Sequence, residues 1–284
     1  MSMRYHKVYR ADSALKHPVQ LCRQMLQDLV ASRELAWRLM IRDIKAQYRQ
    51  SFLGLLWAFV PPVVTAVGIT YARSVGVVSL GETELPYPAY VMFSMALWQT
   101  FVESLSGPIS AVSSAKTMLA RINFPREALI LSKLGELFFN FGIKLLLIIG
   151  LFVGFQMPVT WAALLAPVAL VHLVLLGTGI GLLLAPLGVL YQDVSRLLTV
   201  IVVPWLLITP VIYPLPQGTG VFHSIVKWNP VTPLLVTTRE LATTGVLTKP
   251  SSFWLASLVA WLFLFFGWLL YRLSMPFIVE RMSA

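Results

Sequence analysis

Six long runs of mainly apolar residues constrain what this chain can fold into more than any other feature. Each one approaches or exceeds the roughly 20 residues that a helix needs to cross a bilayer. Charged residues make up only 12% of the sequence, against about 25% in a typical soluble domain. We therefore predict an all-α integral membrane protein with six transmembrane helices, at residues 52–71, 89–112, 129–155, 161–190, 197–213 and 253–273.

A basic, amphipathic block at residues 32–51 leads directly into the first apolar run. At helical spacing, one stripe of this block is apolar and aromatic and the neighbouring stripe is basic. The two stripes consist of Trp37, Met40, Ile41, Ile44 and Tyr48, and of Arg38, Arg42, Lys45 and Arg49. A helix of this kind lies along a membrane surface with its cations near the headgroups. Residues 1–31, which precede it, are polar and predict a cytoplasmic arm.

The distribution of Lys and Arg between the loops predicts the orientation in the membrane. Ten Lys and Arg precede the first apolar run, and further cations follow the second and sixth runs, at Lys116, Arg121, Arg126, Arg272 and Arg281. By the positive-inside rule, the transmembrane domain (52–274) has both chain termini, including the tail at 275–284, in the cytoplasm. The segment at 214–250 must then be external although it carries cations, which are Lys227, Arg239 and Lys249.

The sequence lacks the motifs of common membrane-bound catalysts. It contains no G-x-x-x-x-G-K-[ST] loop, no H-E-x-x-H and no C-x-x-C, and it has one cysteine, Cys22. The four aspartates are scattered, whereas sugar transfer from a nucleotide donor usually needs clustered acids. We predict no catalytic residues, no metal site and no cofactor in this chain. A stand-alone membrane glycosyltransferase or flippase is the alternative from another class.

Four segments carry a more specific pattern. They read RDIKAQYRQSFLGLLW at 42–57, INFPRE at 122–127, YQDVSR at 191–196 followed by TPVIYP at 209–214, and WNPVTPLL at 228–235. In composition, order and placement they resemble the permease subunit of a type 2 ABC exporter, in the branch that exports lipid-linked polysaccharides and teichoic acids. The resemblance covers about residues 33–240.

This resemblance implies a homodimer of permeases in the bacterial inner membrane, with two copies of a separate ATPase that binds the ATP and Mg. It also implies export of a lipid-linked glycan, for which we favour an O-antigen-like polymer. Teichoic acid, capsule, or a small drug or lipid are alternative cargoes. The segment at 116–127 corresponds to the family's cytoplasmic coupling helix, which docks on the ATPase, and the segment at 214–250 to its short external re-entrant helices. The residues expected to couple are Arg121, Ile122, Asn123, Phe124, Pro125, Arg126 and Glu127; the alternative is a basic turn that only sets topology.

The amphipathic block resembles the family's gate helix at the cytoplasmic entrance. A lipid diphosphate needs cations, and we expect it to meet Arg42, Lys45, Tyr48 and Arg49. Anchoring to anionic lipids is the compatible alternative. Aromatic rings suit the faces of sugars but also serve packing and interfacial belts. The channel candidates are Trp57, Phe59, Tyr71, Trp98, Phe101 and Trp205.

Charged residues inside the predicted spans are costly, at about 2.5–3.5 kcal/mol each on insertion scales, and should face protein or water. Glu136, Asn140 and Lys144 recur at helical spacing, and Glu103 lies in the second span. We expect ion pairs or interhelical hydrogen bonds in preference to substrate contact.

Gly177 and Gly181 form a small-xxx-small pair that predicts close helix packing. Pro61 and Pro62 predict a kink in the first span.

Overall fold

The computed structural model describes residues 18–49, 52, 54–77, 81–122, 124–216 and 218–283, and within these ranges it contains helices and no strand. Asn123 and the first 17 residues of the predicted arm lie outside the described residues. The elements are α2 (Pro18–Ala31), α3 (Arg33–Arg49), η1 (Gly54–Ala58), α4 (Val60–Ser74), α5 (Tyr87–Ser114), α6 (Lys116–Arg121), α7 (Glu127–Gly154), η2 (Trp161–Leu165), α8 (Ala166–Leu190), α9 (Asp193–Leu207), α10 (Val221–Trp228), α11 (Val231–Thr243) and α12 (Pro250–Ser283).

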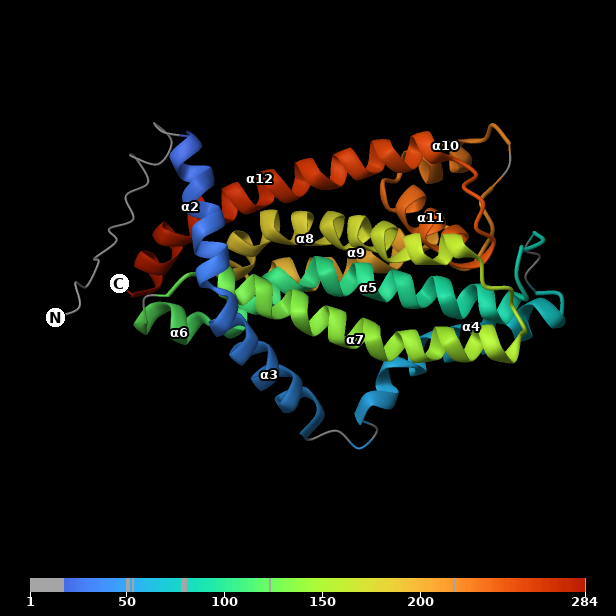
Figure 1. Ribbon diagram of the computed structural model, residues 1–284, viewed down its shortest axis with the longest axis horizontal. Helices are drawn as coiled ribbons and strands as arrows, with labels where there is room; N and C mark the ends of the chain where they lie inside the picture. Colours follow the sequence, from blue (N-terminus) through green and yellow to red (C-terminus); the bar gives the residue numbers. More distant parts are fainter. Residues whose placement is uncertain are drawn as a thin grey trace.

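The long helices form a bundle around α5 and α8. Helix α8 packs against α5 on one side and against α12 on the other, and α5 also contacts α7 and α4 (Figure 1). Buried side chains such as Leu97, Phe101 and Leu105 of α5 meet Leu173 and Leu176 of α8 in one apolar core. Since most of α5 is enclosed by protein, it holds polar side chains such as Ser94, Thr100 and Ser104 in the interior.

Among the residues that the structure describes, three helical segments are long and apolar enough to cross a membrane: Glu127–Gly154, Trp161–Leu190 and Pro250–Arg281. These correspond to the third, fourth and sixth predicted spans. The second predicted span is the largely buried α5, and the fifth is α9, which begins four residues earlier than predicted and ends at Leu207. The last helix also continues through the predicted tail as far as Ser283.

The first apolar run differs most from its prediction. It is divided into η1 and the 15-residue α4, so it is not one kinked helix. Pro61 and Pro62 lie in the first turn of α4, where the missing N–H groups would have no intrahelical partner in any case. The prediction of a kink was therefore wrong, because these prolines begin a helix instead of bending one.

The two ends of the bundle carry different elements. Helices α2 and α6 lie at the end where α12 terminates, and α10 and α11 lie at the opposite end (Figure 1). Helix α11 packs against α8, α12, η2 and α5. It is buried along almost its whole length, including the charged side chains of Arg239 and Glu240. Of the segment predicted as short external helices at 214–250, α11 is therefore part of the packed core, whereas α10 is largely exposed.

Glycines allow α5 and α8 to approach closely, as the small-xxx-small pattern predicted. A Cβ at Gly177 would lie 2.9 Å from the carbonyl oxygen of Phe101, and one at Gly181 would collide with the carbonyl oxygen of Leu105. Both positions face α5, so the backbones of the two helices meet where side chains are absent.

We expect Gly177→Val to lower the free energy of unfolding by about 1–3 kcal/mol, because the added methyl groups must push α8 away from α5. Gly142→Val is the matched control. Gly142 also lies within a long helix, but a Cβ there would meet no atom within 4 Å. Unfolding in mixed micelles with increasing denaturing detergent measures both changes. Equal destabilisation of the two variants would contradict this account of the α5–α8 contact.

Candidate functional site

A cavity of about 590 Å³ lies where α3, η1, α4, α5, α7 and α9 meet. It brings together residues from three of the predicted groups, namely the gate helix, the channel aromatics and the intramembrane polar residues. Its lining includes Gln47, Tyr48, Trp57, Pro61, Trp98, Gln99, Glu103, Asn140, Lys144 and Val202. The cavity therefore combines aromatic, apolar and charged surface in one space within the bundle.

A buried ion pair forms one wall of this cavity. The Lys144 ammonium of α7 lies 2.5 Å from Oε1 of Glu103 on α5 and 3.5 Å from the hydroxyl of Thr100. The lysine side chain is only 2% exposed, whereas that of Glu103 is 35% exposed. Within the described part of the chain, Oε2 of Glu103 and Nε2 of Gln99 have no hydrogen-bond partner. Both atoms are themselves buried, so this wall contains one acceptor and one donor whose hydrogen bonds are unsatisfied.

The polar ribbon on α7 joins three helices, as the preferred structural interpretation predicted. Asn140 accepts a hydrogen bond of 3.0 Å from the hydroxyl of Tyr48 on α3. Glu136 pairs with Lys133 at 2.5 Å, and Lys133 also lies 3.6 Å from Asp43 of α3. Desolvation, with a contribution from the charges of Glu103 and Glu136, raises the pKa of Tyr48, so its hydroxyl stays a donor. These contacts attach α3 to the side of α7.

The cations predicted for a headgroup lie on the exposed surface of α3. Arg42 pairs with Asp43 at 2.8 Å, so its charge is partly neutralised by its own helix. Lys45 and Arg49 are exposed and have no carboxylate within salt-bridge distance among the residues described. Of the predicted cations, these two are the ones available to an anionic group.

The aromatic channel candidates have different surroundings in the structure. Trp57 and Trp98 line the cavity, but Phe59 and Tyr71 do not, and Tyr71 projects from the surface of α4. Trp98, Phe101 and Trp205 form a cluster with centroid separations of 5.2–6.4 Å. The indole N–H of Trp205 donates to Asn229 at 3.1 Å. This cluster joins α5 to α9 and to the turn before α11.

The segment predicted to couple lies at the end of the bundle beside α2 and α12. Its helical part is α6, and Ile122 follows in an extended conformation (φ −128°, ψ 130°). Arg121 and Ile122 are exposed, Phe124, Pro125 and Arg126 are half-buried, and Glu127 is buried in the first turn of α7. In the coupling segment, Arg121 and Ile122 are therefore accessible at the surface, whereas Glu127 is held in the interior by its position in α7.

A buried triad that the sequence did not reveal fixes this segment. Arg272 of α12 lies 2.7 Å from Asp28 of α2 and 2.7 Å from Glu127, and all three side chains are about nine-tenths buried. The hydroxyl of Tyr271 donates to the carbonyl oxygen of Arg126 at 3.2 Å. Since Glu127 and Asp28 lie 145 and 244 positions from Arg272 in the sequence, no local pattern indicates the triad. It links the arm, the coupling segment and the last helix.

A second missed site lies around Arg239 of α11. Its guanidinium donates to the hydroxyl of Ser94 at 2.8 Å and to the carbonyl oxygen of Pro210 at 3.2 Å, and it lies 4.1 Å from the ring centroid of Tyr90. Arg239 is therefore an interior cation that holds α11 to α5. This burial removes part of the conflict with the positive-inside rule, which concerns charges in loops.

Long apolar helices around a cavity with charged walls define a helical membrane protein with a polar interior site. Comparison with known families gives a more specific result. The protein-family model described as "ABC-2 type transporter" matches residues 34–242 of this chain, which is well over half of the sequence. The chain belongs to this family.

Individual relatives are more distant. The chain is 28% identical over 223 residues to an O-antigen export system permease protein, RfbA, of Myxococcus xanthus, covering 77% of this chain and 84% of that protein. It is 23% identical over 209 residues to the protein of the same name from Klebsiella pneumoniae, covering 72% and 79%. It is 20% identical over 250 residues to the polysialic acid transport protein KpsM of Escherichia coli, covering 82% and 91%.

Proposed function

We propose that this chain is the transmembrane permease subunit of an ATP-driven exporter that moves a lipid-linked polysaccharide, of O-antigen type, out of the cytoplasm. Membership of the ABC-2 family supports a transport role, and relatives named for O-antigen export and polysialic acid transport support a polysaccharide cargo. The observation that carries the proposal is the cavity in which the gate helix, the aromatic residues and the Glu103–Lys144 pair meet. It combines rings suited to sugar faces with hydrogen-bonding groups in one space.

Six membrane crossings are part of the proposal. Helices α4, α5, α7, α8, α9 and α12 alternate in direction along the bundle, which supports a crossing by each (Figure 1). The end with α2, α6 and the end of α12 also carries many of the cations, so we place it and both termini in the cytoplasm of a bacterium, at the inner membrane. Helices α10 and α11 then act as re-entrant helices at the outer end, and the burial of α11 in protein supports this assignment.

We place a second copy of the chain against α4 and α9. Helix α9 has no buried residue, and its outer surface presents apolar side chains, as does that of α4. The exposed residues include Val64, Val67, Val200, Val203 and Leu207. A homodimer across these helices would enclose the cavity of each copy between them, forming the path for the glycan. Trp57 would then face that path, and the exposed Lys45 and Arg49 would receive the lipid diphosphate at its entrance.

The energy for transport comes, in this proposal, from two copies of a separate ATPase that binds ATP and Mg. The exposed Arg121 and Ile122 supply a contact surface for it, and the half-buried Phe124 and Arg126 connect that surface to α7 and α12. Closure of the ATPase would push on residues 116–127, and the Arg272 triad would transmit the displacement to the bundle.

The test is co-purification of the chain with candidate ATPases, followed by reconstitution and measurement of glycan export. We expect Phe124→Ala/Arg126→Ala to lower export and cargo-dependent ATPase activity about tenfold, which corresponds to about 1.4 kcal/mol in activation free energy. The matched control is Trp37→Ala/Arg38→Ala, which also removes one ring and one guanidinium but from an exposed face of α3. If no ATPase binds and the chain alone moves or modifies a substrate, the exporter assignment fails.

A further inference from the structure

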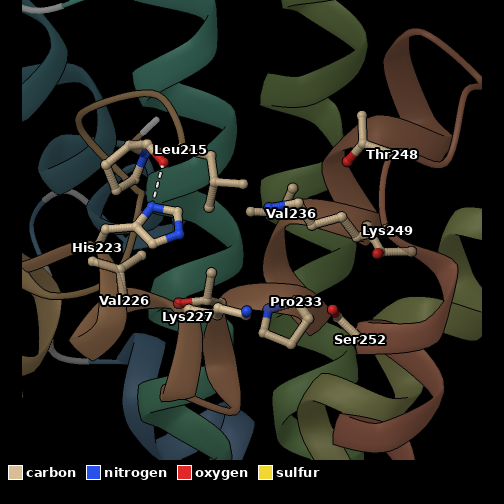
Figure 2. A pocket seen from close by; sticks show the side chains of 12 residues that line it. Leu215, His223, Val226, Lys227, Pro233, Val236, Thr248, Lys249 and Ser252 are labelled. Carbon is tan, nitrogen blue, oxygen red and sulfur yellow. Dashed lines mark hydrogen bonds between the residues drawn. The ribbon is translucent and has the colours of Figure 1, made fainter. Parts of the chain in front are cut away.

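A small pocket lies at the end of the bundle opposite the coupling segment, between α10, α11 and the start of α12. Its volume is about 40 Å³, enough for a few waters or one small oxyanion group. His223, Lys227, Lys249 and Ser252 line it, above an apolar floor (Figure 2). None of these side chains belongs to the cavity described above or to the proposed path.

The pocket is rich in positive charge. Within the part of the chain described by the structure, neither Lys227 nor Lys249 has a carboxylate within salt-bridge distance. The nearby carboxylate of Glu240 is occupied, because it accepts from the hydroxyl of Thr248 at 2.6 Å and from its backbone N–H at 3.1 Å. Two ammonium groups beside one carboxylate leave the pocket with a net positive charge.

Oriented polar groups add to this charge. Thr232 is 4% exposed and lines the pocket, and its hydroxyl has no hydrogen-bond partner among the residues described. Ser252 lies in the first turn of α12, where backbone N–H groups and the helix dipole favour an anion. His223 is held by a 2.8 Å hydrogen bond from Nδ1 to the carbonyl oxygen of Pro216, and its other ring nitrogen faces the pocket (Figure 2).

The surroundings indicate where the anion comes from. Trp228 of α10, Trp254 of α12 and Trp161 of η2 are all exposed near this end of the bundle. Exposed tryptophans beside lysines are typical of the level of lipid headgroups. The apolar floor, which includes Val226 and Val236, suits the glycerol region of a lipid better than a fully hydrated ion.

We propose that this pocket binds the phosphate group of an anionic membrane phospholipid through Lys227, Lys249, Thr232 and the first turn of α12. A bound headgroup would connect α10 and α11 to the start of α12 and stabilise this end of the bundle. The inference requires only that the chain lies in a membrane, so it stands or fails separately from the identity of the exported cargo.

Native mass spectrometry of the full-length chain, extracted from nanodiscs of phosphatidylcholine containing phosphatidylglycerol, tests this site. We expect preferential retention of phosphatidylglycerol, and a loss of affinity of about 30-fold in Lys227→Gln/Lys249→Gln, since each lysine near a membrane surface contributes about 1 kcal/mol. Lys227→Arg/Lys249→Arg should keep most of the affinity. Thr232→Val, which is nearly isosteric, should weaken retention without unfolding the chain.

The control is Arg73→Gln, which removes one cation from the end of α4, on the same end of the bundle but outside the pocket. Retention in the lysine double variant equal to wild type would overturn the proposal, as would an equal loss in the Arg73 variant. Displacement of the lipid by millimolar inorganic phosphate would also overturn it, because that result identifies a site for small anions instead of a lipid headgroup.

Discussion

Arg272→Met is expected to lower the free energy of unfolding by about 3–5 kcal/mol, because two buried carboxylates lose the guanidinium that they share. Asp28 and Glu127 each lie 2.7 Å from this group, and their side chains are 11% and 8% exposed. Methionine is apolar and fills much of the volume of the arginine stem. The loss of unfolding free energy therefore comes mainly from removing the positive charge and less from lost packing. Unfolding in mixed micelles measures the stability of the variant against wild type.

Two controls separate this effect from the removal of any arginine. Arg38 pairs with Glu34 at 2.6 Å, but both side chains are about three-quarters exposed, so Arg38→Met should cost about 0–1 kcal/mol. Asp28→Asn/Glu127→Gln/Arg272→Met removes all three charges and should recover much of the loss. If the triple variant is as unstable as Arg272→Met, the triad contributes through packing and this explanation is wrong.

Glu103→Gln should destabilise the chain more than Lys144→Met, although both break the same ion pair. The ammonium of Lys144 is almost fully enclosed, so without Glu103 it would be a buried cation whose remaining hydrogen-bond partner among the described residues is the hydroxyl of Thr100. Such a change typically costs about 3–5 kcal/mol. The carboxylate of Glu103 borders the cavity, and after Lys144→Met water in the cavity can solvate it, so a smaller loss is expected.

A double-mutant cycle tests this asymmetry. Glu103→Gln/Lys144→Met should be more stable than Glu103→Gln alone, because it no longer buries an unpaired ammonium. The same variants also report on the cavity when export is assayed. Losses of equal size in the two single variants would mean that the cavity does not hydrate Glu103, which would weaken its assignment as part of a polar path.

Much of the local structure follows from the sequence because it depends on residues close together in the chain. The basic block at 32–51 is helical over Arg33–Arg49, since its periodicity and composition favour a helix directly. The apolar runs near 129–155 and 161–190 appear as long helical segments. The prediction for Pro61 and Pro62 was wrong because a pair of prolines can either bend a helix or begin one. Which of the two occurs depends on where the helix starts, and the sequence does not define that position.

The polar ribbon on α7 could be predicted as a stripe, and its use between helices was the preferred interpretation. Its partners could not be predicted: Tyr48 lies 92 positions from Asn140, and Glu103 lies 41 positions from Lys144. The cations at 214–250 illustrate the same limit. In the sequence they form one group, yet Arg239 is buried beside Tyr90 while Lys227 and Lys249 border a surface pocket.

By itself, the sequence determined that this chain is helical, belongs in a membrane and carries a basic amphipathic helix, because hydrophobicity and helical periodicity act over neighbouring residues. Only the tertiary structure decided which charges are neutralised and which remain available. The Arg272 triad, the Glu103–Lys144 pair and the burial of Arg239 each depend on helices brought together by packing. An ion pair in an interior requires both a low dielectric and contact within a few ångströms, and only the packed fold supplies the two together.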